Sequence, residues 1–178
     1  MNRQEGEQMV RMKHVLYAVG IAAALVGPAA ARADAATVTV SVNAQLLTIN
    51  QSGDPQICPE GAMTCTSSLA GAEVKAFAAT PASAAGDLVS LFNSKALGSC
   101  ITMKDGTCTL NVPVSGNYVL VLRWQDPTTP SPPTSVYLAT PLAPGADNGP
   151  VVERQMQLVR WVGDQTKWSG GQVEVVTG

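Results

Sequence analysis

The fold class is decided by residues 104–124, whose sequence is KDGTCTLNVPVSGNYVLVLRW. Asp105-Gly106 can take the left-handed conformations of a tight hairpin turn, and Ser115-Gly116-Asn117 predicts another turn. Thr107 to Val112, which lies between these turns, alternates polar and apolar residues. Tyr118 to Trp124 is apolar on both faces for most of its length, as a strand at the centre of a sandwich would be. This segment therefore predicts neighbouring β-strands joined by short turns.

Strand patterns extend to both sides of this segment. Thr37 to Asn43 alternates strictly, and Leu46 to Ile49 continues that strand or follows a bulge. Gly71 to Ala78 alternates again, and Ile101 to Met103 leads into the Asp-Gly turn as the first arm of a predicted hairpin. Two closing strands are predicted at Val151 to Val162 and Gln172 to Val176.

Three segments carry weaker signals. Asn50 to Ser68 resembles a long polar loop. Asp87 to Phe92 fits either a strand or one short helix. Asp126 to Pro150 holds seven prolines in 25 residues, which predicts loop and edge structure with a short strand at Ser135 to Ala139. Short strands at regular spacing with turns between them indicate an all-β sandwich. We therefore expect one domain over residues 34–178, with a proline-rich loop at 126–150.

The N-terminus has the three regions of a cleavable secretory signal. Arg11 and Lys13 precede Val15 to Gly27, an uncharged apolar run of 13 residues. Pro28 ends the run, and Ala31-Arg32-Ala33 has the small-x-small pattern of a cleavage site. A membrane span needs roughly 20 apolar residues, so the run is too short. We expect a signal peptide at residues 1–33, cleaved near Ala33, and a secreted or periplasmic product without a membrane span.

The four cysteines, Cys58, Cys65, Cys100 and Cys108, all follow the predicted cleavage site. Four cysteines in an exported domain usually form two disulfides, for which three pairings exist. The pairs 58–65 and 100–108 are favoured because each is close in sequence. Zinc is the competing interpretation. Neither pair has CxxC spacing, however, and no histidine follows the signal, so we expect disulfides and no metal.

The charge balance excludes one class of partner. Residues 34–178 keep 7 of the 11 Lys and Arg and 11 of the 13 Asp and Glu, a formal net charge of −4. Nucleic-acid binding depends on clustered cations, and these charges are scattered singly. We therefore expect no nucleic-acid partner.

Three weak motifs, in this order and spacing, resemble carboxypeptidase regulatory-like domains and the related Cna protein B-type repeats, which are prealbumin-like sandwiches. Residues 69–77 (LAGAEVKAF) are similar to their opening strand, residues 104–113 (KDGTCTLNVP) to their hairpin, and residues 115–121 (SGNYVLV) to the strand that follows. The similarity covers about residues 36–125. It implies a seven-stranded Greek-key, prealbumin-like or Ig-like sandwich that acts as a spacer, stabiliser or binding module, normally without catalysis.

The sequence departs from that family in two ways. Many B-type repeats form a Lys–Asn isopeptide bond between their first and last strands. Here Thr37 to Asn43 has no lysine and Val151 to Gly178 has no asparagine, so no isopeptide is expected. The cysteines and the proline-rich segment also lie outside the family's pattern.

Catalytic residues are scarce. The only histidine, His14, lies in the predicted signal, which removes histidine-based nucleophilic and general-base systems from the mature chain. A carboxylate pair can still hydrolyse glycosides. The acids sit mostly at turns (Asp54, Asp105, Asp126, Asp147, Asp164), where Asp is favoured for backbone reasons. We expect no catalytic residue and no cofactor.

The three tryptophans are candidates for a binding surface. Packing in or around the core is the more common role of tryptophan, and Trp124 ends a predicted buried strand. Trp168, beside Lys167, Ser169 and two glycines, is the best candidate for exposure, with Trp161 as the second candidate.

Three classes of function follow. The first is an exported, non-enzymatic module that binds a protein or glycan. The second is a fibre or coat subunit that donates its N-terminal strand, Ala36 to Asn43, to a neighbour. An ordinary first strand is preferred for that segment, so the protein is either a monomer or part of a surface assembly. The third is a hydrolase that uses carboxylates alone.

Overall fold

The computed structural model describes residues 36–80, 87–129, 133–143, 151–163 and 165–177, which form two five-stranded sheets. Sheet A contains β1 (Thr37–Asn50), β2 (Thr64–Ser68), β5 (Thr107–Pro113), β8 (Val151–Val162) and β9 (Lys167–Ser169). Sheet B contains β3 (Glu73–Ala78), β4 (Gly98–Ile101), β6 (Tyr118–Gln125), β7 (Thr134–Leu142) and β10 (Gln172–Thr177). The prediction of an all-β sandwich is confirmed. The ten strands exceed the seven that the family resemblance implies.

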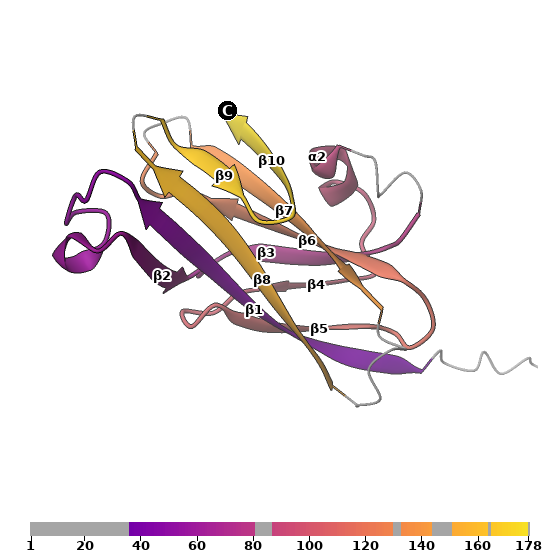
Figure 1. Ribbon diagram of the computed structural model, residues 1–178. Helices are drawn as coiled ribbons and strands as arrows, with labels where there is room; N and C mark the ends of the chain where they lie inside the picture. The colour runs from indigo at the N-terminus through magenta and orange to yellow at the C-terminus, as the bar shows by residue number, and fades with distance from the viewer. Residues whose placement is uncertain (1–35, 81–86, 130–132, 144–150, 164, 178) are drawn as a thin grey trace, which may run out of the picture. The chain divides into compact units, whose positions relative to one another are not determined.

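Strands β1 and β8 form the spine of sheet A and run side by side (Figure 1). They are parallel, with the register running from Thr39 opposite Val151 to Asn50 opposite Val162. The other edge of β1 pairs with β5 over its first half and with β2 over its second half. The two halves of the predicted first strand are thus one continuous strand, paired on both sides within its own chain.

Ala44 marks the point at which β1 changes partner. Its N–H donates to the carbonyl of Gly106 at 2.8 Å, and its carbonyl accepts the N–H of Leu69 at 3.0 Å. Gly106 has φ +80°, and a Cβ atom there would collide with the carbonyl oxygen of Ala44. The glycine predicted to form the turn is therefore required both for its backbone conformation and for this close approach.

The main core lies between the sheets and follows from the alternation of the strands. Val40, Val42 and Leu46 of β1 are buried there. They pack in the same cluster as inward side chains of β6 and β7, which include Leu120, Leu122 and Leu138. Central strand β6 is apolar on both faces, as predicted, because the face that points away from this core packs against a second apolar cluster.

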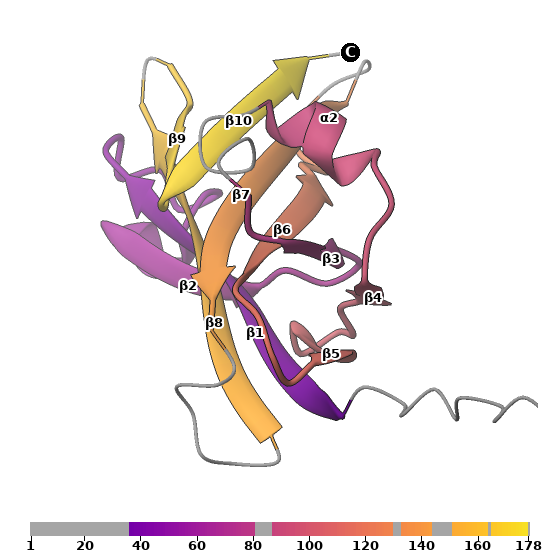
Figure 2. The same ribbon diagram turned by 90° about the vertical axis from the view of Figure 1, so that its right-hand side faces the viewer.

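The second cluster involves α2 (Leu88–Phe92), which lies against sheet B in Figure 2. Leu88 and Phe92 pack in it with Val121 and Tyr137. The side chain of Asp87 caps the helix by accepting the N–H of Ser90 at 3.0 Å. The segment 87–92 is thus a short helix, which resolves the sequence-based ambiguity.

The predicted hairpin at residues 101–112 is wrong in its pairing. The turn forms, with the Gly106 N–H donating to the Met103 carbonyl at 3.0 Å. Its arms, however, pair with different sheets: β4 with β3, and β5 with β1. The reason is packing, since Cys108, Leu110 and Val112 of β5 must be buried beside the valines of β1.

Tyr118, at the start of β6, fixes the turn before it. Its hydroxyl group lies within hydrogen-bonding distance of the carbonyls of Pro113 at 2.9 Å and Ser115 at 2.6 Å. A tyrosine bonded back to the backbone a few residues upstream is a known device for corners of β-sandwiches. The predicted turn at 115–117 is therefore held from inside the domain.

Other differences are smaller. The predicted loop at 50–68 contains η1 (Pro59–Gly61) and ends in β2, and β7 is longer than the predicted strand at 135–139. Strand β9 was not predicted. The signal at 1–33 and much of the proline-rich segment lie outside the described residues. No helix within the described ranges is both long enough and apolar enough to cross a membrane.

Candidate functional site

The outward face of sheet A carries a ladder of paired side chains, which are polar at one end and apolar at the other. Because side chains alternate along a strand, burial of the even-numbered core positions of β1 and β8 turns the odd-numbered positions to solvent. The register then aligns these positions in pairs: Ser41 with Glu153, Asn43 with Gln155, Gln45 with Gln157, Leu47 with Val159, and Ile49 with Trp161. We call this surface the sheet A face.

Amide groups dominate the middle of the sheet A face. The Gln155 amide nitrogen donates to the Gln45 amide oxygen at 3.0 Å across the two strands. A depression of about 560 Å³ lies here, and its lining consists of neutral polar residues and one residue of each charge: Ser41, Asn43, Gln45, Thr107, Glu153, Arg154 and Gln155. Amides and hydroxyls are both donors and acceptors, so the surface is equipped to bond a ligand rich in hydroxyl groups.

Trp161 stands at one end of the ladder and is 37% exposed. Its indole N–H donates to the hydroxyl of Ser169 in β9 at 3.3 Å, which fixes the ring. A second depression, of about 440 Å³, is lined by Trp161, Gln51, Gln165 and Lys167. The tryptophan thus offers an aromatic surface with amide and ammonium groups beside it.

Trp168 is less exposed than its sequence context predicts, and the order of the two candidates is reversed. Trp168 pairs with Arg160, whose side chain points inward, so Trp168 also points inward. Lys167 pairs with Trp161 and points outward with it. The Trp168 ring is half-buried and meets the ring of Trp124 edge-on at 6.1 Å between centroids. Trp124 is itself buried, as predicted. Trp168 therefore supports the core, and only Trp161 of the predicted pair contributes to the sheet A face.

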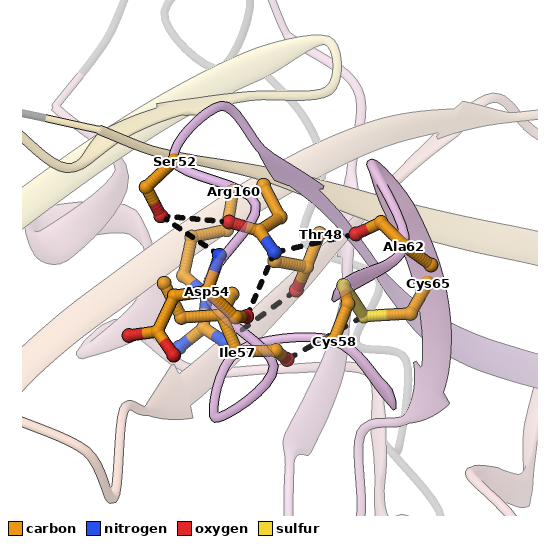
Figure 3. Close-up of a disulfide and its surroundings, with 9 residues drawn as sticks. Thr48, Ser52, Asp54, Ile57, Cys58, Ala62, Cys65 and Arg160 are labelled. Carbon is orange, nitrogen blue, oxygen red and sulfur yellow. Dashed lines mark hydrogen bonds between the residues drawn. A yellow bond between two sulfur atoms is a disulfide. The ribbon is translucent and has the colours of Figure 1, made fainter. Parts of the chain in front are cut away.

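The cysteines form the two predicted disulfides, Cys58–Cys65 and Cys100–Cys108. The first closes the loop after β1, shown in Figure 3. Asn50 organises the same loop from within: its side chain is buried and donates to the carbonyls of Asp54 at 2.9 Å and Ala62 at 3.3 Å. No signal in the sequence distinguished Asn50 from an ordinary turn residue.

Behind this loop lies a cavity of about 410 Å³, which we call the Arg160 cavity. Its lining residues come from three segments that are far apart in the sequence: Gln56, Ile57, Asp126, Thr128, Thr129, Arg160, Val162 and Thr166. Figure 3 shows Arg160 beside the disulfide loop, reaching toward Thr48. Sequence reasoning missed Arg160, since its partner Asp126 is 34 positions away.

Three of the acidic residues that were assigned to turns do form hydrogen bonds with the backbone of their own turn. In each, a carboxylate oxygen accepts the backbone N–H of the residue two positions later, at 2.9 Å. The donors are Gln56 for Asp54, Thr107 for Asp105, and Thr128 for Asp126. Asp126 goes further, because it is only 2% exposed and faces Arg160. Asp147 and Asp164 lie outside the described residues. Within the described ranges, no cluster of three or more His, Cys, Asp or Glu side chains is arranged to hold a metal ion.

No protein-family model matches the chain, and no curated protein is significantly similar to it.

Proposed function

We propose that this protein is an exported, non-enzymatic β-sandwich module that binds a glycan chain along the sheet A face. The observation that carries the proposal is the exposed Trp161 at the end of a ladder whose other half is polar. An aromatic ring can pack on the C–H face of a sugar, and flanking amides can bond its hydroxyl groups.

The form of the surface suits an extended ligand. The paired positions recur along β1 and β8 at roughly 6.6 Å, twice the rise per residue of a strand. The ladder from Ser41 and Glu153 to Ile49 and Trp161 therefore presents polar groups at one end and apolar groups at the other to an extended polymer.

Two observations bear on where the protein works. Two disulfides indicate an oxidising compartment. The predicted signal peptide at residues 1–33 would direct export of the protein. Mass spectrometry of the secreted protein tests this prediction by locating the cleavage site. The carboxypeptidase regulatory-like resemblance agrees with a binding or spacer module and belongs to the same proposal.

Strand donation to a neighbouring subunit is the weaker alternative. Strand β1 is paired on both sides within its own chain, with β8 on one side and β5 and β2 on the other. Donation would require the removal of β1 from all three strands. A monodisperse monomer in size-exclusion chromatography would exclude that assembly.

The glycan proposal is tested by glycan arrays and by co-sedimentation with insoluble polysaccharides. We expect Trp161→Ala to weaken binding about tenfold or more, because tryptophan is enriched among the few residues that dominate binding energy. Gln155→Ala should weaken it by a smaller factor. Ile101→Ala is the matched control, since Ile101 is 66% exposed but lies in β4 of sheet B. Silence on every glycan, or equal loss in Trp161→Ala and Ile101→Ala, would refute the proposal.

A further inference from the structure

A second polar site lies on the other side of strand β8. Arg160 and Trp161 are consecutive, so alternation sends Trp161 to the sheet A face and Arg160 toward the sandwich interior. We propose that the Arg160 cavity binds a single neutral sugar residue, or a polyol of that size, separately from the sheet A face.

The cavity is of suitable size and is formed before any ligand enters. Its volume of about 410 Å³ falls within the roughly 300–1,000 Å³ typical of small-molecule sites. One wall is the loop closed by Cys58–Cys65 and held by the buried amide of Asn50. Because this wall is already ordered, ligand binding does not carry the entropy cost of ordering the loop.

The ion pair between Arg160 and Asp126 in the cavity has a long contact distance. An Arg160 terminal nitrogen lies 3.5 Å from the Asp126 Oδ2 atom, longer than the roughly 2.7–2.9 Å of a strong charged hydrogen bond. The other Arg160 bonds are also long, 3.2 Å to the Thr128 hydroxyl and 3.4 Å to the Thr48 hydroxyl. The Arg160 Nε atom is buried and has no partner among the described residues. The terminal nitrogens of the guanidinium group, whose bonds are long, therefore retain donor capacity.

Asp126 retains acceptor capacity in the same way. Its Oδ1 atom accepts the N–H and the hydroxyl of Thr128 at 2.9 and 2.6 Å. Within the described part of the chain, its Oδ2 atom receives only the long contact from Arg160. Removing two charges from water is expensive, and a poorly made buried pair is weak evidence for a role in stability. The arrangement fits a pair that completes its bonding with a ligand.

The lining selects the chemistry of that ligand. The two opposite charges are neighbours, so a bound anion would face Asp126 and a bound cation would face Arg160. A hydroxyl group both donates and accepts, so adjacent hydroxyls can accept from Arg160 and donate to Asp126. Thr129, Thr166 and Gln56 add neutral polar groups, while Ile57 and Val162 supply apolar contact. Neutral sugars combine these two kinds of surface.

The test is titration of the purified protein with glucose, galactose, mannose and N-acetylglucosamine, followed by NMR of the arginine side-chain N–H signals. Glucuronate is included as the anionic probe. We expect at least one neutral sugar to shift the Arg160 signals saturably, and glucuronate to bind no tighter than its neutral counterpart. Trp161→Ala should leave this binding unchanged, which separates it from the function proposed for the sheet A face.

Two variants locate the site. Arg160→Lys keeps the charge but loses the planar fork, and we expect about tenfold weaker binding. Gln56→Trp fills the cavity from the loop side and leaves the residues Arg160 and Asp126 themselves unchanged, so it serves even if Arg160→Lys folds poorly. The proposal is overturned if no neutral sugar shifts the Arg160 signals, if glucuronate binds at least tenfold tighter, or if Gln56→Trp binds as the wild type does.

Discussion

Cys100 and Cys108 join the two sheets of the sandwich covalently. Cys100 lies in β4, opposite Val74 of sheet B, and Cys108 lies in β5, opposite Val42 of sheet A. Their Cα atoms are 5.9 Å apart, and the disulfide replaces the hydrogen-bonded ladder that a hairpin would have placed there. The short connection between β4 and β5 is thus a crossing from one sheet to the other.

Removing this crossing disulfide should destabilise the whole domain. We expect Cys100→Ser/Cys108→Ser to lower the free energy of unfolding by about 2–4 kcal/mol, because the unfolded chain regains entropy and two hydroxyls replace sulfurs at or near the core. Guanidinium unfolding measures this change. An unaltered midpoint and slope would show that the core alone holds the two sheets together.

The other disulfide should act locally. In Cys58→Ser/Cys65→Ser we expect amide hydrogen exchange to accelerate in the loop from Gln51 to Met63, because the closing bond is lost while Asn50 remains. Exchange in β6 should change much less. Equal acceleration in the loop and in β6 would mean that this disulfide also supports the global fold.

The two candidate tryptophans should differ in their effect on stability. Trp168→Ala removes the edge-on contact with Trp124 and should lower the free energy of unfolding by about 2–4 kcal/mol. Trp161→Ala removes an exposed ring and should change it by less than about 1 kcal/mol. Urea unfolding of both variants checks the order, and the reverse order would contradict the inward placement of Trp168.

Asp105 should make the turn between the sheets sensitive to acid. Hydrogen bonds from the backbone N–H and the hydroxyl of Thr107 lower the pKa of Asp105 below its ordinary value of 3.8. The ionised carboxylate therefore stabilises the folded state above pH 3.8, and this contribution is lost as the pH falls through the lowered pKa.

Urea midpoints measured from pH 7 down into the acid range test this linkage. Below pH 3.8, the stability of the wild type should fall more steeply than that of Asp105→Asn, which cannot titrate at this position. Thr107→Val, which loses only the hydroxyl bond, should be intermediate. Parallel pH curves for the three proteins would rule out a contribution from Asp105.

Arg160 and Asp126 should be coupled in stability even though their contact is long, because removing one partner leaves the other charge buried. Arg160→Met leaves the buried Asp126 carboxylate without its cation and should lower the free energy of unfolding by about 3–5 kcal/mol. Arg160→Met/Asp126→Asn should lose much less than the sum of the two single changes, because no uncompensated charge remains. Additive losses in this double-mutant cycle would show that the two side chains do not interact.

Much of the local structure was predictable because strand alternation and turn chemistry are properties of neighbouring residues. Thr37 to Asn43, Tyr118 to Trp124 and Val151 to Val162 all form strands where their patterns indicate. The disulfide pairings were also predictable, since each pair is close in sequence. The candidate site was less predictable. The sequence indicated Trp161 as a surface residue but ranked its exposure below that of Trp168. Which of the two points outward depends on the strand register, which the sequence does not show.

The sequence by itself thus determined most of the strands, most turns, the disulfides and the burial of Trp124. Only the tertiary structure decided which strands share a sheet. The parallel pairing of β1 with β8, the separation of β4 from β5, and the meeting of Arg160 with Asp126 all join residues through space. Alternation tells which face of a strand is apolar, but it carries no information about the neighbouring strand. That choice depends on how all the apolar faces fill one core together.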